Sequence, residues 1–144
     1  MPARGPLLLA LTAGALIASG CGAEEGSNPT SASFSDGEQQ AVAASIQDIS
    51  DATGSRDYAK ICSDYLAAPL AKQLAEAKGA EDCADRVERS LRDVDQSDLA
   101  VREVTVEGTT AEAVVQPTGT GEAEEQARLS LVKEGSRWKL SGVG

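Results

Sequence analysis

Residues 101–115 read V-R-E-V-T-V-E-G-T-T-A-E-A-V-V, and this stretch predicts a β-hairpin. Apolar and polar residues alternate on both sides of a turn at Gly108-Thr109, as they do in strands that bury one face. The alternation slips by one residue at Arg102-Glu103, which indicates a β-bulge in the first strand. The hairpin therefore has one apolar face that other parts of the chain must cover.

A second pair of strands is predicted closer to the C-terminus. Residues 127–132 again alternate between apolar and polar side chains, and Trp138 and Leu140 have the same spacing. Residues 134–136 between them read E-G-S, which has the composition of a hairpin turn. We therefore expect a sheet of about four antiparallel strands, with one apolar face and one polar face.

The segment before the strands has the spacing of helices instead. Apolar residues recur every three or four positions from residue 36 to about residue 52, and Gly54 follows as a helix end. Ser35 and Glu38 have the spacing of a capping box, so we expect Ser35 to be the N-cap.

Three shorter helices are predicted next along the chain. Asp57 suits the N-cap of the first, Pro69 suits the first turn of the second, and the third begins near Glu81. The middle helix is expected to extend to Gly79. Helices followed by antiparallel strands define an α+β domain, so we predict N-terminal helices packed on a C-terminal antiparallel sheet over residues 35–144.

Residues 1–20 have the composition of a secretory signal peptide. Arg4 precedes an apolar run of twelve residues, from Leu7 to Ala18. A helix of that length spans about 18 Å, whereas the hydrocarbon of a bilayer is roughly 30 Å thick. We therefore expect export and removal of this segment, and no transmembrane anchor.

The residues at the end of this segment, A-S-G-C at 18–21, resemble the lipobox of bacterial lipoproteins. The resemblance implies transfer of a diacylglyceryl group to the Cys21 thiol, with palmitate among its acyl groups, and then cleavage of the chain before Cys21. Ala18 stands where that family most often has Leu. Because several acyl chains hold a protein stably, we expect it at the extracytoplasmic face of the cell membrane, with residues 21–34 as lipidated Cys and flexible linker. The alternative is an ordinary signal peptide with Cys21 as a plain thiol.

An exported chain with three cysteines has one pair left once Cys21 is acylated. Cys62 and Cys83 are that pair, and the extracytoplasmic space permits a disulfide between them. The alternative is two buried free thiols. Two thiols without His cannot complete a tetrahedral zinc site, so we expect neither a metal nor another cofactor.

The charge balance argues against a nucleic-acid partner. The formal net charge is −10, and loss of Arg4 with the signal peptide would make it −11, whereas phosphate contacts need clustered Lys and Arg. The absence of His excludes His-based catalytic triads. The acidic run at 93–98 lacks the Gly and Glu of a calcium loop and is expected to be a solvated linker.

Three segments together resemble a known domain family. D-Y-A-K-I-C at 57–62, V-R-E-V-T-V-E-G at 101–108 and E-G-S-R-W-K-L at 134–140 carry the resemblance. They are similar to the nuclear-transport-factor-2-like (cystatin-like) domains found in small lipoproteins of actinobacteria. The resemblance implies a cone-like domain whose open mouth serves relatives as a small-molecule pocket.

Tyr58 and Tyr65 share one face of the predicted short helix and are candidate pocket residues. The alternative is that both rings belong to the core, with their hydroxyls at its edge. No catalytic motif is present, so we expect a lipid-anchored, non-enzymatic binding module of the cell envelope, with an envelope protein or a small apolar ligand as partner. The alternatives are an enzyme that uses the cone interior as its active site and a structural envelope protein. An interior filled by side chains would exclude both an enzyme and a small-ligand site, and would leave contact with another protein as the function.

Overall fold

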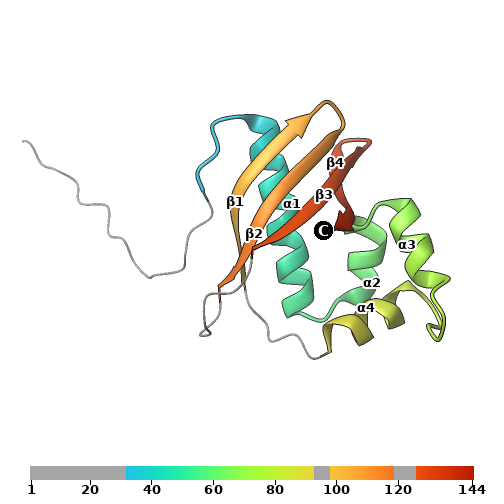
Figure 1. Ribbon diagram of the computed structural model, residues 1–144. Helices are drawn as coiled ribbons and strands as arrows, with labels where there is room; N and C mark the ends of the chain where they lie inside the picture. The colour runs from blue at the N-terminus through green and yellow to red at the C-terminus, as the bar shows by residue number, and fades with distance from the viewer. Residues whose placement is uncertain (1–31, 93–97, 119–125) are drawn as a thin grey trace, which may run out of the picture.

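A computed structural model describes residues 32–92, 98–118 and 126–144 of the chain (Figure 1). The predicted signal peptide, the acylation site at Cys21, most of the predicted linker and the acidic run at 93–97 lie outside these residues. The described segments are helical first and then form strands, so the predicted α+β class and element order are confirmed.

Within the described residues the N-terminal half contains four α-helices and one π-helical segment. These elements are α1 (Gly37–Gly54), α2 (Tyr58–Lys60), the π-helix η1 (Ile61–Tyr65), α3 (Ala68–Ala75) and α4 (Cys83–Leu91). As predicted, Asp57 is the N-cap of α2, where its carboxylate accepts a hydrogen bond from the backbone N–H of Lys60. Pro69 stands in the first turn of α3, where its missing N–H costs no hydrogen bond.

The predicted N-cap of α1 is wrong by one residue. Asp36, not Ser35, caps the helix, and its Oδ1 accepts from the backbone N–H groups of Glu38 and Gln39 at 2.9 and 3.2 Å. A carboxylate is the stronger cap here, because it is charged and faces the positive end of the helix dipole. The side chain of Glu38 is thereby released for contacts elsewhere.

The predicted end of α3 is also wrong. The helix ends at Ala75, four residues before Gly79, and a turn follows in which the N–H of Ala77 donates to the carbonyl of Leu74. Gly79 lies inside this turn with φ of +85°, a conformation that glycine adopts without a steric penalty. The glycine therefore serves the turn and not the helix terminus.

The C-terminal half is one antiparallel sheet. Its strands are β1 (Asp98–Glu107), β2 (Thr110–Thr118), β3 (Ala127–Glu134) and β4 (Arg137–Val143), and they lie side by side in chain order. The register between β1 and β2 shifts between Val101 and Glu103, which confirms the predicted bulge. The sheet is open, since β1 and β4 do not pair.

Short segments of backbone contact both edges of this open sheet. Beside β1, the N–H of Ala32 donates to the carbonyl of Val101 at 2.8 Å. Beside β4, Leu66 forms a parallel bridge with Leu140, whose carbonyl accepts from the N–H of Ala67 at 2.8 Å. These contacts occupy backbone groups that an unprotected edge would offer to other chains.

The helices cover one face of the sheet, and the core has two parts (Figure 1). In the first part, Val42 and Ile46 of α1 are fully buried and pack against apolar residues of all four strands. The second part joins the end of α1 to the short helices; its buried members are Ala52, Ile61, Leu66 and Val87. The other face of the sheet carries polar pairs such as Arg128–Glu112, whose Nη1 and Oε1 atoms are 2.7 Å apart.

None of the helices in the described residues has the length and apolar character needed to cross a lipid bilayer.

Candidate functional site

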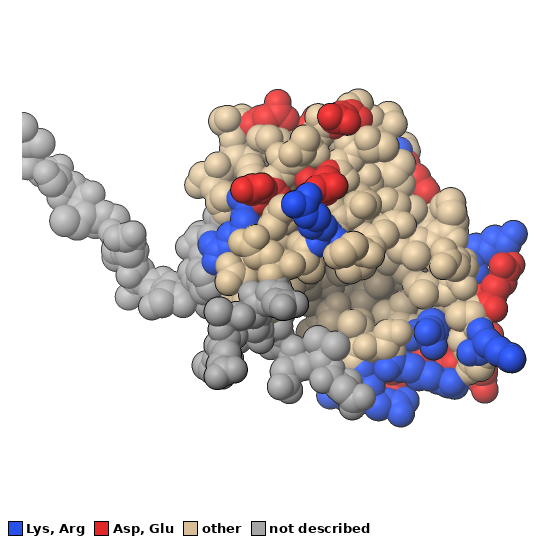
Figure 2. Space-filling view, viewed as in Figure 1, with Lys and Arg blue, Asp and Glu red and all other residues tan. Residues whose placement is uncertain are grey.

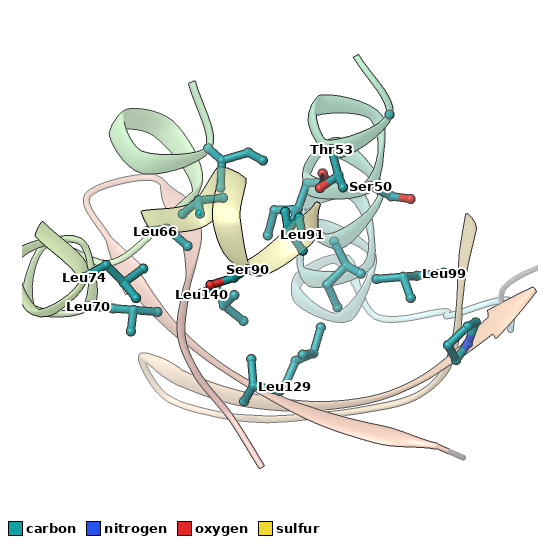
Figure 3. Close-up of a pocket in the computed structure, with 17 residues that line it drawn as sticks. Ser50, Thr53, Leu66, Leu70, Leu74, Ser90, Leu91, Leu99, Leu129 and Leu140 are labelled. Atoms are coloured by element: carbon teal, nitrogen blue, oxygen red, sulfur yellow. Dashed lines mark hydrogen bonds between the residues drawn. The ribbon is translucent and has the colours of Figure 1, made fainter. Parts of the chain in front are cut away.

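A cavity of about 620 Å³ lies between α1, the short helices and the inner face of the sheet (Figure 3). Helices α1, α3 and α4 contribute to its wall, together with η1 and at least one residue from each of the four strands. The strands supply Leu99, Pro117, Leu129 and Leu140, which lie across the sheet from β1 to β4. The space between the helices and the sheet is therefore hollow.

The wall of the cavity is almost entirely aliphatic. None of the residues that line it is aromatic, and none has a side chain that titrates. Its side-chain polar atoms are the hydroxyls of Ser50, Thr53 and Ser90. The hydroxyl of Thr53 donates to the carbonyl of Ile49 at 2.8 Å, and that of Ser90 donates to the carbonyl of Arg86 at 2.9 Å. The Ser50 hydroxyl has no hydrogen-bond partner within the described residues.

The residues that line the cavity differ in burial: buried residues form its floor, and exposed residues mark its mouth. Ile46, Ile61 and Leu129 are buried and form part of the floor. Ser90 and Val143 are exposed, and Val143 keeps 69% of its surface in contact with solvent. Figure 2 shows the corresponding hollow between the sheet and the short helices. A molecule can therefore enter from the side where α4 and the end of β4 meet solvent.

The composition of the chain explains why this space stays open. The chain has only four aromatic residues, and the large ring of Trp138 is used in the first part of the core. Leu, Ile and Val side chains line the gap between the two parts of the core, and they are too short to meet across it. An apolar cavity of this kind holds apolar groups in preference to water.

A disulfide between Cys62 and Cys83 fastens one wall of the cavity, as predicted. It joins η1 to the first residue of α4, with the two Cα atoms 6.2 Å apart. Val87, one helical turn further along α4, lines the cavity. The bridge therefore holds the cavity-lining face of α4 close to η1.

Neither Tyr58 nor Tyr65 lines the aliphatic cavity. Both are partly buried and pack against the second part of the core. Tyr65 borders a separate, smaller depression with Lys60 and Asp64, and the Lys60 Nζ lies 5.8 Å from its ring centroid. A pocket role for the two tyrosines stays a prediction, and it concerns a different place from the cavity.

A polar cluster joins α1 to the β3–β4 hairpin. The Glu38 carboxylate accepts from the Lys133 Nζ at 2.6 Å and from the Trp138 Nε1 at 2.8 Å, and Nζ lies 5.7 Å from the indole centroid. The hydrogen bond from Lys133, followed by that from Trp138, lowers the pKa of Glu38 below its ordinary value of 4.5. None of the three lines the cavity, so the cluster is a structural contact.

Sequence reasoning missed the polar residues that line the cavity, among them Ser50 and Ser90. For Ser90, the signal was the strongly amphipathic pattern of residues 83–91, in which Val87 and Leu91 share a face that Ser90 borders. Within the described residues, no three Cys, Asp or Glu side chains are grouped so that they could hold a metal ion.

Comparison of the chain with models of protein families, with curated proteins and with solved structures gave no match.

Proposed function

We propose that this chain is an exported lipoprotein whose α+β domain binds a small apolar ligand without converting it chemically. In this proposal, residues 1–20 are removed, acyl chains on Cys21 hold the protein at the extracytoplasmic face of the cell membrane, and residues 21–34 link the anchor to the domain. The A-S-G-C sequence at 18–21 supports the anchor.

The observation that carries the binding role is the aliphatic cavity. Its volume of about 620 Å³ falls within the range of ligand pockets, roughly 300–1,000 Å³. General acid–base catalysis in such an interior would need a side chain that titrates, and no lining residue has one. The wall therefore favours binding over the alternative of an enzyme, and its emptiness favours a ligand over purely structural packing.

The fold supports the narrower proposal that the domain is nuclear-transport-factor-2-like. In this chain, helices pack against an open antiparallel sheet and the space between them reaches solvent, as the resemblance to cone-like domains implies. The segments at 57–62, 101–108 and 134–140 fall in α2–η1, in β1 and in the β3–β4 hairpin. They therefore belong to elements that surround or support the cavity.

The binding role is tested with Nile red, a neutral dye that fluoresces in apolar surroundings. The exported full chain carries Cys21→Ala, so that no acyl group of its own competes. Leu99→Trp fills one end of the cavity, while Thr105→Trp adds the same ring on an exposed position of the same strand. Because overpacking costs about 1–3 kcal/mol, we expect Leu99→Trp to weaken dye binding by roughly tenfold or more.

The Thr105→Trp control should bind the dye as the parent chain does. Circular dichroism and the melting temperature check that both variants are folded. Equal dye binding by the parent and by a folded Leu99→Trp variant would contradict a ligand site in the cavity.

A further inference from the structure

We propose that the cavity accommodates one long-chain fatty acid, with its alkyl chain inside and its carboxylate at the mouth beside Arg86. This inference rests on the proposed ligand-binding function and names the class of ligand. It depends on the volume of the cavity, its extent across the sheet, the direction of its hydroxyl protons and the position of one arginine.

The volume fits a single alkyl chain. A methylene group needs about the same space as a water molecule, whose share of liquid volume is roughly 30 Å³. The cavity of about 620 Å³ thus holds on the order of 20 such groups. One fatty-acid chain fills this space, whereas the two chains of a phospholipid exceed it.

The extent of the cavity fits a chain that lies across the strands. Its wall includes Leu99 of β1 and Leu140 of β4, the two outer strands, and continues to Leu70 and Leu74 of α3. Four adjacent strands are separated by three gaps of about 4.8 Å, so the wall extends about 14 Å across the sheet before it reaches α3. Aliphatic side chains line this whole path, and an alkyl chain needs nothing else.

The hydroxyls of the wall do not suit a carboxylate inside the cavity. A carboxylate only accepts hydrogen bonds, but Thr53 and Ser90 already donate their protons to carbonyls of their own helices. Ser50 alone retains a free proton among the three. A buried carboxylate would therefore lack partners, which is costly, and the charged end of the ligand belongs outside.

We expect that charged end beside Arg86, because Ser90 on the same helix lines the exposed part of the cavity. Arg86 lies one helical turn before Ser90, so the two residues share the edge of the α4 face that lines the cavity. Arg86 is exposed and forms no ion pair within the described residues, whereas the neighbouring Arg89 is bound to Asp85 at 2.9 Å. Figure 2 shows Lys and Arg side chains over α3 and α4 along one side of the hollow.

The pairing of an aliphatic wall with a free guanidinium at its edge matches the two ends of a fatty acid. An arginine keeps its charge at every physiological pH, and its planar group binds carboxylates through two parallel hydrogen bonds. In a chain of net charge −10, an unpaired Arg at the mouth also opposes the general repulsion of an anionic ligand.

The test compares palmitate with hexadecanol, which has the same alkyl chain but no charge. The affinity of each ligand is measured by its displacement of Nile red from three chains. These are the exported full chain carrying Cys21→Ala, the same chain with Arg86→Gln added, and the same chain with Arg137→Gln added. Arg137 is an exposed arginine at the start of β4 that does not line the cavity. Because an exposed ion pair contributes up to about 1 kcal/mol, Arg86→Gln should weaken palmitate binding about fivefold.

Hexadecanol should bind equally to all three chains, and Arg137→Gln should bind palmitate like the parent. Added salt should weaken palmitate binding only where Arg86 is present, because salt screens exposed charges. If Arg86→Gln leaves palmitate affinity unchanged while both ligands still displace the dye, the fatty-acid inference is wrong and the proposed apolar site stands. If a two-chain phosphatidylglycerol binds as well as palmitate, the single-chain inference is wrong. If nothing displaces the dye, both proposals fail.

Discussion

Glu38 connects α1 to the β3–β4 hairpin, because its carboxylate binds both Lys133 and Trp138. These two partners follow Glu38 in the sequence by 95 and 100 residues. Local sequence rules assign it instead to a capping box with Ser35. The rule fails here because Asp36 already satisfies the first N–H groups of α1. A long-range contact of this kind depends on how the hairpin packs against α1, which sequence spacing does not reveal.

We expect Glu38→Gln to lower the melting temperature at neutral pH, with a smaller effect in acid. The pKa of Glu38 is lower in the folded protein than in the unfolded chain, so the ionised form stabilises the fold. This contribution is present above the unfolded pKa of about 4.5 and disappears as the pH falls through the lower folded value. Melting curves between pH 3 and pH 7 measure the difference between the variant and the parent.

Glu112→Gln is the matched control, because Glu112 forms an exposed ion pair with Arg128 on the outer face of the sheet. Exposed pairs contribute little, so its melting temperature should stay close to that of the parent. A difference between Glu38→Gln and the parent that grows on acidification would contradict the role assigned to the Glu38 carboxylate.

At the scale of elements, the sequence predicts which helices and strands exist better than it predicts the residues at which they begin and end. The sequence correctly predicted the cap at Asp57, Pro69 in the first turn of α3, the bulge near Arg102 and both hairpins, because each depends on neighbouring residues alone. The π-helix η1 was not predicted, because its register, with the N–H of Leu66 bonded to the carbonyl of Ile61, gives no distinct sequence pattern.

The disulfide is the element-scale contact whose removal is simplest to measure. The two cysteines are 21 residues apart, and closing a loop of that size stabilises the fold by about 3 kcal/mol in the chain-entropy model. Cys62→Ser should therefore lower the melting temperature by more than about 10 °C for a domain of roughly 100 residues. A reducing agent should lower the melting temperature of the parent by a similar amount.

The same reducing agent applied to Cys62→Ser is the control, and it should have no further effect. Because α4 carries one wall of the cavity, reduction should also weaken binding of Nile red. Reaction of both thiols with a labelling reagent in the native, unreduced protein would show that the bridge is absent.

At the scale of the whole molecule, the hollow interior could not be predicted from the spacing of apolar residues. Ile46, Leu66 and Leu129 have the spacing of ordinary core residues, and they are indeed buried. Whether such side chains meet or leave a space depends on how far α1 and the short helices stand from the sheet. In the sequence, only the family resemblance of residues 57–62, 101–108 and 134–140 implied an open interior.

In the proposed function, acyl chains on Cys21 determine where the protein is located, and Cys21→Ala tests this. Two or three acyl chains on a single Cys residue hold a protein stably in a bilayer, whereas an acidic domain is repelled by anionic lipid headgroups. We therefore expect the parent chain in the membrane fraction and the Cys21→Ala variant in the soluble extracytoplasmic fraction. Immunoblots of fractionated cells measure the distribution, and mass spectrometry of the amino terminus detects the acyl groups.

Ala18→Leu is the matched control, because it restores the residue most common in the lipobox and should keep the protein in the membrane fraction. Cys62→Ser, which removes a different thiol, should also leave the distribution unchanged. If the Cys21→Ala variant remains in the membrane fraction, Cys21 does not carry the membrane anchor and the proposed location of the domain is wrong. The dye and fatty-acid experiments would retain their meaning, since they use a chain without acyl groups and depend only on the folded domain.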